Sequence, residues 1–118
     1  MRILIADDND MVRRGVIGLL SVESDWTVCG EAKDGSEAIQ KAREFLPDVI
    51  LLDISMTGIN GLDVARRLRQ ELPNVKLLVI SQHDPYVMLP LVIEAGCDAC
   101  LDKSRLATDL VTTIKNLR

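Results

Sequence analysis

The sequence alternates short apolar runs with segments of helical periodicity along its whole length. The most strand-like run, "DVILLD" at 48–53, is apolar at successive positions, as in a strand covered on both faces. The predicted strands are residues 2–6, 26–31, 48–53, 76–81 and 99–103. The predicted helices are residues 11–22, 35–45, 61–71, 85–95 and a last helix for which Ser104 is the expected N-cap. The alternation predicts βαβ units, and hence an α/β fold with helices on both faces of a parallel sheet.

Five strands and right-handed crossovers leave few topologies. By analogy we expect a flavodoxin-like (βα)5 doubly wound sheet, in strand order 2-1-3-4-5, as one domain over residues 1–118. Pro47 and Pro73 should end the second and third helices, and Gly96 should cap the fourth. The second helix is expected to point Phe45 and Leu46 into the core.

Composition excludes several classes of protein. The formal net charge of −4 argues against non-specific binding to nucleic acid or anionic lipid. No run is long enough to span a bilayer or to act as a signal peptide, so a cytoplasmic location is expected. The odd number of cysteines (Cys29, Cys97 and Cys100) fits a reducing compartment, and Cys97 and Cys100 are interpreted as small core residues rather than a redox or zinc motif.

Polar residues follow the predicted strands at the end where ligands bind in such sheets. Asp7 and Asp8 follow the first strand, Asp53 ends the third, Ser81 the fourth and Lys103 the fifth. Each residue alone could be a solvated strand end or an ordinary surface side chain. All of them together predict one polar site built from distant parts of the chain.

The clustered carboxylates suit Mg²⁺, which prefers oxygen ligands. Asp53 could then form an aspartyl phosphate, with Mg²⁺ and Lys103 neutralising charge and Ser81 donating to a phosphoryl oxygen. Gly58 and Gly61 would keep the following loop close to that group. Asp10 is interpreted as a helix N-terminal acid.

The chain resembles a response-regulator receiver domain over essentially all of residues 1–118. The matching stretches are "ILIADDND", "PDVILLDISMTGINGLDVARRLR", "LLVIS" and "EAGCDACLDKS". The resemblance implies that Asp53 accepts a phosphoryl group from a sensor histidine kinase, that Ser81 is the switch hydroxyl and that Lys103 pairs with the phosphoryl group. It also implies that Mg²⁺ is bound directly by Asp8, Asp53 and the Ser55 backbone carbonyl, and by Asp7 through water.

The resemblance also implies an output. Phosphorylation is expected to alter the face made by the fourth helix, fifth strand and fifth helix. The fifth strand is most similar to receivers joined to helix-turn-helix DNA-binding domains, so transcription control through a C-terminal effector domain is expected. A homodimer is expected through this face or through the first and fifth helices, with no direct nucleic-acid or membrane contact by this chain.

Three positions depart from the family pattern. Thr57 stands where proline is usual, and Cys100 stands where an aromatic switch residue is usual. Pro90 should kink, delay or break the fourth helix. Its apolar stretch "MLPLVI" is either a partner surface or a longer buried face. We therefore expect intact chemistry with an atypical output face, and phosphoryl lifetime tuned by Ser55 and His83.

Competing functions are a flavodoxin-type cofactor domain, a metal-dependent phosphatase and a pseudo-receiver that only binds protein. "DDND" would repel a cofactor phosphate unless a metal were bound. A phosphatase generally needs an acid at the position of Ser55. A pseudo-receiver stays open as the alternative to a phosphorylation-controlled switch that is not a turnover enzyme.

Overall fold

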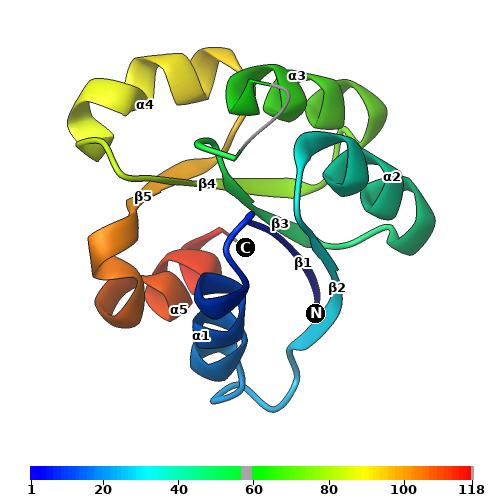
Figure 1. Ribbon diagram of the computed structural model, residues 1–118, viewed down its shortest axis with the longest axis vertical. Coiled ribbons are helices and arrows are strands. Elements are labelled where there is room, and N and C mark those ends of the chain that lie inside the picture. Colours follow the sequence, from blue (N-terminus) through cyan, green and yellow to red (C-terminus); the bar gives the residue numbers. More distant parts are fainter. Residues whose placement is uncertain (57–59, 118) are drawn as a thin grey trace.

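The computed structural model describes residues 1–56 and 60–117, which form one five-stranded parallel sheet flanked by helices (Figure 1). The strand order is β2-β1-β3-β4-β5, as the flavodoxin-like prediction required. The strands are β1 (Arg2–Ala6), β2 (Thr27–Ala32), β3 (Val49–Asp53), β4 (Lys76–Ser81) and β5 (Ala99–Asp102). The helices are α1 (Asp10–Leu20), α2 (Gly35–Phe45), α3 (Gly61–Glu71), α4 (Pro85–Glu94) and α5 (Leu106–Asn116), with a short 3-10 turn, η1 (Lys103–Arg105), before α5.

Successive residues of the central strands face opposite sides of the sheet, so each strand contributes to two cores. α1 and α5 cover one face, where Val16 and Leu110 pack on Ile5 and Leu51. α2, α3 and α4 cover the other face around Leu52. All five residues of β3 are buried, which confirms that this run is a strand covered on both sides.

Several boundaries differ from the prediction. Trp26 precedes β2, and its buried ring packs in the α1–α5 core instead of extending the strand. β5 ends at Asp102, so Lys103 begins the 3-10 turn. Ser104 is not the N-cap of α5, which begins at Leu106 without a side-chain cap. Instead the Asp102 carboxylate accepts hydrogen bonds from the Ser104 amide (2.9 Å) and hydroxyl (2.7 Å).

The prediction for Leu46 was wrong. α2 ends at Phe45, and Leu46 adopts a left-handed conformation with φ of 47°, which turns its side chain outward to 63% exposure. Gly96 follows α4 with φ of 89°, and its amide donates to the Ile93 carbonyl, as the predicted C-terminal glycine should.

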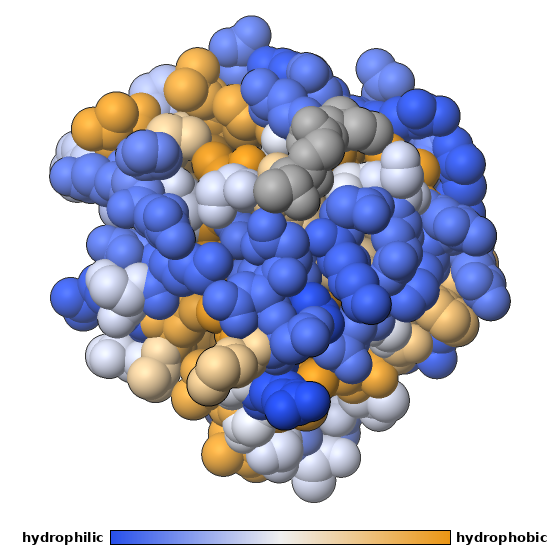
Figure 2. Space-filling model, viewed as in Figure 1, coloured by the Kyte–Doolittle hydropathy of each residue, from blue (hydrophilic) through white to orange (hydrophobic). Residues whose placement is uncertain are grey.

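α4 is helical through Pro90, so it neither starts late nor breaks. Asp84 caps it by accepting a hydrogen bond from the Tyr86 amide, and Pro85 occupies a favourable position in the first turn. Only Val92 is fully buried among the residues of this helix. Its exposed apolar residues are Tyr86, Val87, Leu89, Leu91 and Ile93. Figure 2 shows apolar surface over α4, so the partner-surface interpretation is supported and the longer buried face is wrong.

Gly61 allows α3 to start against the backbone that follows Asp53. A Cβ there would lie 2.5 Å from the Ile54 carbonyl oxygen and would also clash with the Ile54 Cα. We predict that Gly61→Ala lowers the free energy of unfolding by about 1–3 kcal/mol, measured by urea denaturation. Gly18→Ala is the control, because a Cβ there meets no described atom within 4 Å, and it should stabilise α1 by roughly 0.5–1 kcal/mol. Equal effects of the two substitutions would contradict the close approach.

Candidate phosphoacceptor site

The carboxyl ends of the central strands bring the predicted polar residues to one edge of the sheet. Asp53 lies beside Ile80, and Ser81 lies beside Asp102, in the parallel registers. Carboxylate oxygens of Asp7, Asp8 and Asp53 all lie within 4.8 Å of one another. The structure therefore confirms that these segments, far apart in the sequence, converge.

Lys103 bridges two of the acids. Its Nζ lies 3.0 Å from Asp53 Oδ2 and 3.3 Å from Asp7 Oδ2, and its side chain is largely buried. Burial alone would lower the pKa of this ammonium, but the hydrogen bond and charge of Asp53, with the charge of Asp7, raise it above its ordinary value. The lysine is therefore a fixed positive charge at the site.

Asp53 is fully buried, yet it is held in its ionised form. Its Oδ1 accepts hydrogen bonds from the Ser55 amide (2.9 Å) and the Ser55 hydroxyl (2.6 Å), while Lys103 holds its Oδ2. Burial would raise the pKa of this carboxyl, but the hydrogen bonds from Ser55 and Lys103 outweigh it and lower the pKa. The carboxylate is thus ionised at neutral pH.

Asp7 has the opposite electrostatic character. Its Oδ1 accepts a hydrogen bond from the Asn9 amide at 2.8 Å. Its buried Oδ2 has the Lys103 ion pair but no hydrogen-bond partner among the described residues. Burial, and then the charge of Asp53, raises the pKa of Asp7. A divalent cation would satisfy this oxygen and relieve the repulsion, so the donor set fits a hard metal ion.

Other predicted residues lie around this cluster. Ser81 is buried, and its Oγ accepts a hydrogen bond from the amide of exposed His83 at 3.0 Å. Cys100 is half-buried in β5 beside Val79 of β4 and packs against the α2–α3–α4 core. Thr57 and Gly58 lie outside the described residues. Asp10 begins α1 and forms an ion pair with Arg13, as expected of a helix N-terminal acid.

The cysteines behave as structural residues. Cys29, Cys97 and Cys100 are all free thiols. Burial raises the pKa of Cys97 to about 11 and also raises the pKa of Cys100. Thiols that resist ionisation are poor nucleophiles and poor metal ligands, which agrees with the interpretation of the C-x-x-C pair as core.

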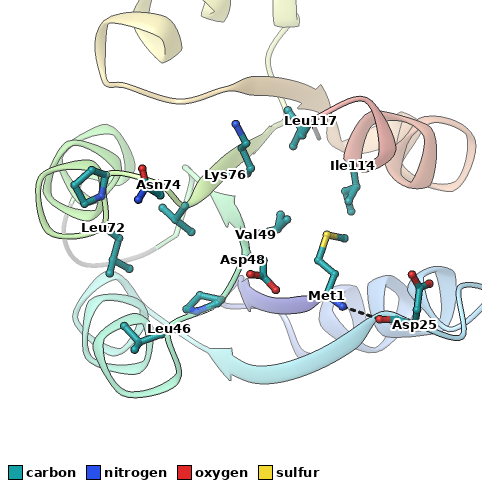
Figure 3. Close-up of a pocket in the computed structure, with 13 residues that line it drawn as sticks. Met1, Asp25, Leu46, Asp48, Val49, Leu72, Asn74, Lys76, Ile114 and Leu117 are labelled. Atoms are coloured by element: carbon teal, nitrogen blue, oxygen red, sulfur yellow. Dashed lines mark hydrogen bonds between the residues drawn. The ribbon is translucent and has the colours of Figure 1, made fainter.

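A cavity of about 670 Å³ lies away from this chemistry. Met1, Val49 and Lys76 line it at the amino ends of the strands, together with Leu117 (Figure 3). The acidic cluster is at the opposite edge of the sheet. The cavity therefore has no part in the acidic cluster.

One residue near the cluster was missed by sequence reasoning. Arg13 is buried, and its guanidinium lies under the β1–α1 turn, where it donates to the Asp7 carbonyl at 2.6 Å. The sequence feature that could have revealed it is helical spacing, because Arg13 lies on the same buried face of α1 as Val16 and Leu20. A charged residue on an apolar stripe has a specific partner more often than not.

The response regulator receiver domain family matches residues 3–115. The chain belongs to that family. It is 33% identical to the response regulator protein VraR of Staphylococcus saprophyticus, over 98% of this chain and 55% of that protein. It is 36% identical to the transcriptional regulatory protein DegU of Brevibacillus brevis, over 98% of this chain and 49% of that protein.

Solved receivers have the same fold. The receiver domain of the putative response regulator NarL from Mycobacterium tuberculosis superposes with a TM-score of 0.89 at 33% identity, covering 98% of this chain and 94% of that one. A LuxR-family response regulator from Aurantimonas has a TM-score of 0.92 at 29% identity, covering 98% and 83%. The predicted similarity to receivers of DNA-binding regulators is thus confirmed.

Membership of the family establishes the general function of the chain. Receivers are components of two-component signalling and not turnover enzymes, and the relatives include transcription regulators. The chain spans about half the length of the curated relatives it matches. Within the described residues, no helix is both long and apolar enough to cross a membrane.

The buried charge of Asp7 should destabilise the metal-free protein relative to a variant with an uncharged side chain at this position. We predict that Asp7→Asn raises the free energy of unfolding in EDTA by about 0.5–2 kcal/mol, because the amide keeps the Asn9 contact without the charge. A raised pKa means that the folded protein holds this proton more tightly than the unfolded chain, so ionisation destabilises the fold. The gain in the free energy of unfolding from Asp7→Asn should therefore grow as the pH rises above the ordinary aspartate pKa.

Urea denaturation at several pH values measures this gain. Asp63→Asn is the matched control, because Asp63 is exposed on α3 and pairs only across one helical turn with Arg66. A gain for Asp7→Asn that did not vary with pH would contradict the electrostatic explanation.

Proposed function

We propose that this receiver is a phosphorylation-controlled switch in which Asp53 accepts a phosphoryl group from a sensor histidine kinase. The observation that carries the proposal is a fully buried carboxylate with a lowered pKa between a lysine and two further acids. In the transfer, an Asp53 oxygen forms the new bond to phosphorus. The phosphorus–nitrogen bond of the phosphohistidine breaks, and its electron pair returns to the imidazole.

Asp8, Asp53 and the Ser55 carbonyl would hold Mg²⁺ directly, with Asp7 contributing through water. The Asp7 Oδ2, which has an ion pair with Lys103 but no hydrogen bond among the described residues, supports this assignment. The ion would neutralise the charge that gathers on the phosphoryl oxygens during transfer. Lys103 would supply the protein's own positive charge there, and the buried Ser81 hydroxyl would donate to a phosphoryl oxygen.

Ser55 and His83 are proposed to set the lifetime of the phosphoryl group. The Ser55 hydroxyl lies 2.6 Å from the Asp53 carboxylate, so it would stand beside any water that attacks the acyl phosphate. His83 is exposed two residues beyond Ser81, and its amide donates to the Ser81 hydroxyl oxygen. Both residues would therefore control the access of water to the acceptor.

We propose that the output is transcription control from a cytoplasmic location, through an effector domain C-terminal to the receiver. The names of the relatives and their greater length support this proposal. The apolar surface of α4 supports an output face built around α4, β5 and α5, and a homodimer would form there or through α1 and α5. Cys100 leaves no aromatic ring to follow the movement of Ser81.

The phosphoacceptor is tested by labelling with acetyl phosphate and Mg²⁺. Asp53→Asn should abolish labelling, because the amide is not nucleophilic, and intact-protein mass spectrometry should show no added phosphate. Asp63→Asn should label like the unchanged protein, because its carboxylate is exposed on α3, away from the site. Labelling that survived in Asp53→Asn would identify another acceptor, and no labelling of the unchanged protein would favour the pseudo-receiver.

The switch is tested by amide NMR with beryllofluoride and Mg²⁺. We expect shifts near Asp53, Ser81 and Lys103 but small shifts along residues 84–100, because the half-buried Cys100 cannot transmit the movement as a ring would. Large shifts throughout α4 and β5 would show ordinary coupling and contradict the atypical output.

A further inference from the structure

Arg13 is a buried cation beside the acidic site that the chemistry above does not use. Its side chain is 7% exposed, although it lies on a surface helix. It lies three residues beyond the first residue of α1, directly beneath the turn that carries Asp7 and Asp8. A guanidinium is buried at such a cost only where several acceptors surround it.

The guanidinium of Arg13 has three separate acceptors. Nη1 donates to the Asp7 backbone carbonyl at 2.6 Å, and this contact is buried. Nε donates to Glu31 Oε1 at 3.0 Å, near the end of β2. Nη2 pairs with the Asp10 carboxylate in the first turn of α1. One rigid planar group thus ties together the end of β1, the end of β2 and the start of α1.

The Asp7 carbonyl belongs to the peptide that joins the two acids of the site. A hydrogen bond to this carbonyl fixes the plane of the Asp7–Asp8 peptide, and therefore the relative placement of the two carboxylates. The Asp7 amide is held from the other side by the Ala32 carbonyl at 3.0 Å. The Asn9 amide then closes the turn onto Asp7 Oδ1 at 2.8 Å.

We infer that Arg13 is a positioning residue for the metal site: its guanidinium holds the Asp7–Asp8 peptide in the orientation that binds a divalent cation. This inference rests on the proposed function, since it assigns Mg²⁺ to that cluster. Groups that orient metal ligands without touching the metal are typically worth 10–100-fold in metal affinity.

The positive charge of Arg13, taken alone, predicts the opposite effect on Mg²⁺ affinity. A positive group beside the cluster repels a cation, so its removal should strengthen Mg²⁺ binding. Arg13→Lys keeps the charge but loses the planar fork that reaches three acceptors, whereas Arg13→Gln loses the charge and part of the fork. Positioning therefore predicts weaker binding in both variants. A charge effect predicts unchanged binding for lysine and tighter binding for glutamine.

The experiment measures the Mg²⁺ dissociation constant by calorimetry, at a temperature where urea titrations show every variant to be folded. We expect Arg13→Lys to raise the dissociation constant by about tenfold. Arg14→Lys is the matched control, because Arg14 is the next residue of α1 and its side chain is exposed. That control should bind Mg²⁺ like the unchanged protein.

A second readout needs no metal. The Asn9 amide donates to Asp7 Oδ1, so its hydrogen-exchange rate reports the turn directly. Arg13→Lys should speed this exchange in EDTA, and Arg14→Lys should not. Unchanged exchange together with unchanged Mg²⁺ affinity in Arg13→Lys would overturn the inference. If the unchanged protein bound Mg²⁺ no better than Asp8→Asn, the proposed metal site would fail, and the Asn9 exchange rate alone would decide the role of Arg13.

Discussion

The ion bridge from Lys103 to Asp53 and Asp7 is the interaction on which the polar edge of this sheet depends. Two buried carboxylates at one sheet edge repel each other, and burial penalises both charges. The ammonium lies within 3.3 Å of both acids, and Ser55 adds two hydrogen bonds to Asp53 alone. The pKa values consequently diverge, with Asp53 lowered and Asp7 raised. The bridge keeps Asp53 ionised, as the proposed phosphoacceptor must be, and leaves Asp7 with a charge that a further cation would stabilise.

The strand order is what makes this bridge possible. Lys103 follows β5, and its partner Asp53 ends β3, so its side chain must reach across β4. The register of β4 and β5 brings Lys103 close to this edge. Ser81 pairs with Asp102 at the end of the two strands, and the chain then turns into η1, which begins at Lys103. The serine expected to contact a phosphoryl group therefore ends the strand that lies between those of the acceptor and the lysine. A different strand order would separate these side chains however well each strand formed.

The sheet and its polar edge could be predicted from the sequence because both rest on patterns that physics makes regular. Successive apolar residues mark strands covered on two faces, and parallel strands carry their ends to one edge. Asp53 and Lys103 follow from that rule alone. What the sequence did not show are choices between local hydrogen bonds of similar strength. Asp102 takes the amide and hydroxyl of Ser104, so η1 precedes α5.

Leu46 and Arg13 are further examples of such local choices. The helical pattern of α2 continues to Leu46, but the chain reverses there in a left-handed conformation that no periodicity reveals. Arg13 falls on a buried stripe, yet its partners come from the residue after β1, from β2 and from the first turn of its own helix. A guanidinium becomes recognisable as a structural centre only when those acceptors are assembled in three dimensions. Local patterns predict elements well, and they predict side-chain networks poorly.

The two ends of α4 are held very differently, and this decides where a signal can act. Its C-terminal end is fixed: Arg69 of α3 donates to the Gly96 carbonyl at 2.8 Å and pairs with Asp98 at 2.8 Å. Its N-terminal end begins at Pro85, two residues beyond His83, whose amide donates to the Ser81 hydroxyl oxygen. The first side chains of the helix, Tyr86 and Val87, are exposed.

The middle of α4 adds little resistance, because only Val92 is fully buried and Pro90 provides no amide for the carbonyl of Tyr86. A ligand or modification shifts a conformational equilibrium only by its difference in free energy between the two states. A helix that is anchored firmly at one end and weakly elsewhere can be shifted by a small difference in free energy between its two conformations. The first turns of α4, where Tyr86 and Val87 present its apolar surface, are therefore the part of this helix that is easiest to move, while Arg69 keeps the last turn in place. With Cys100 in place of an aromatic ring, no aromatic side chain of β5 couples those turns to Ser81, and the proposed phosphorylation should leave them largely where they are.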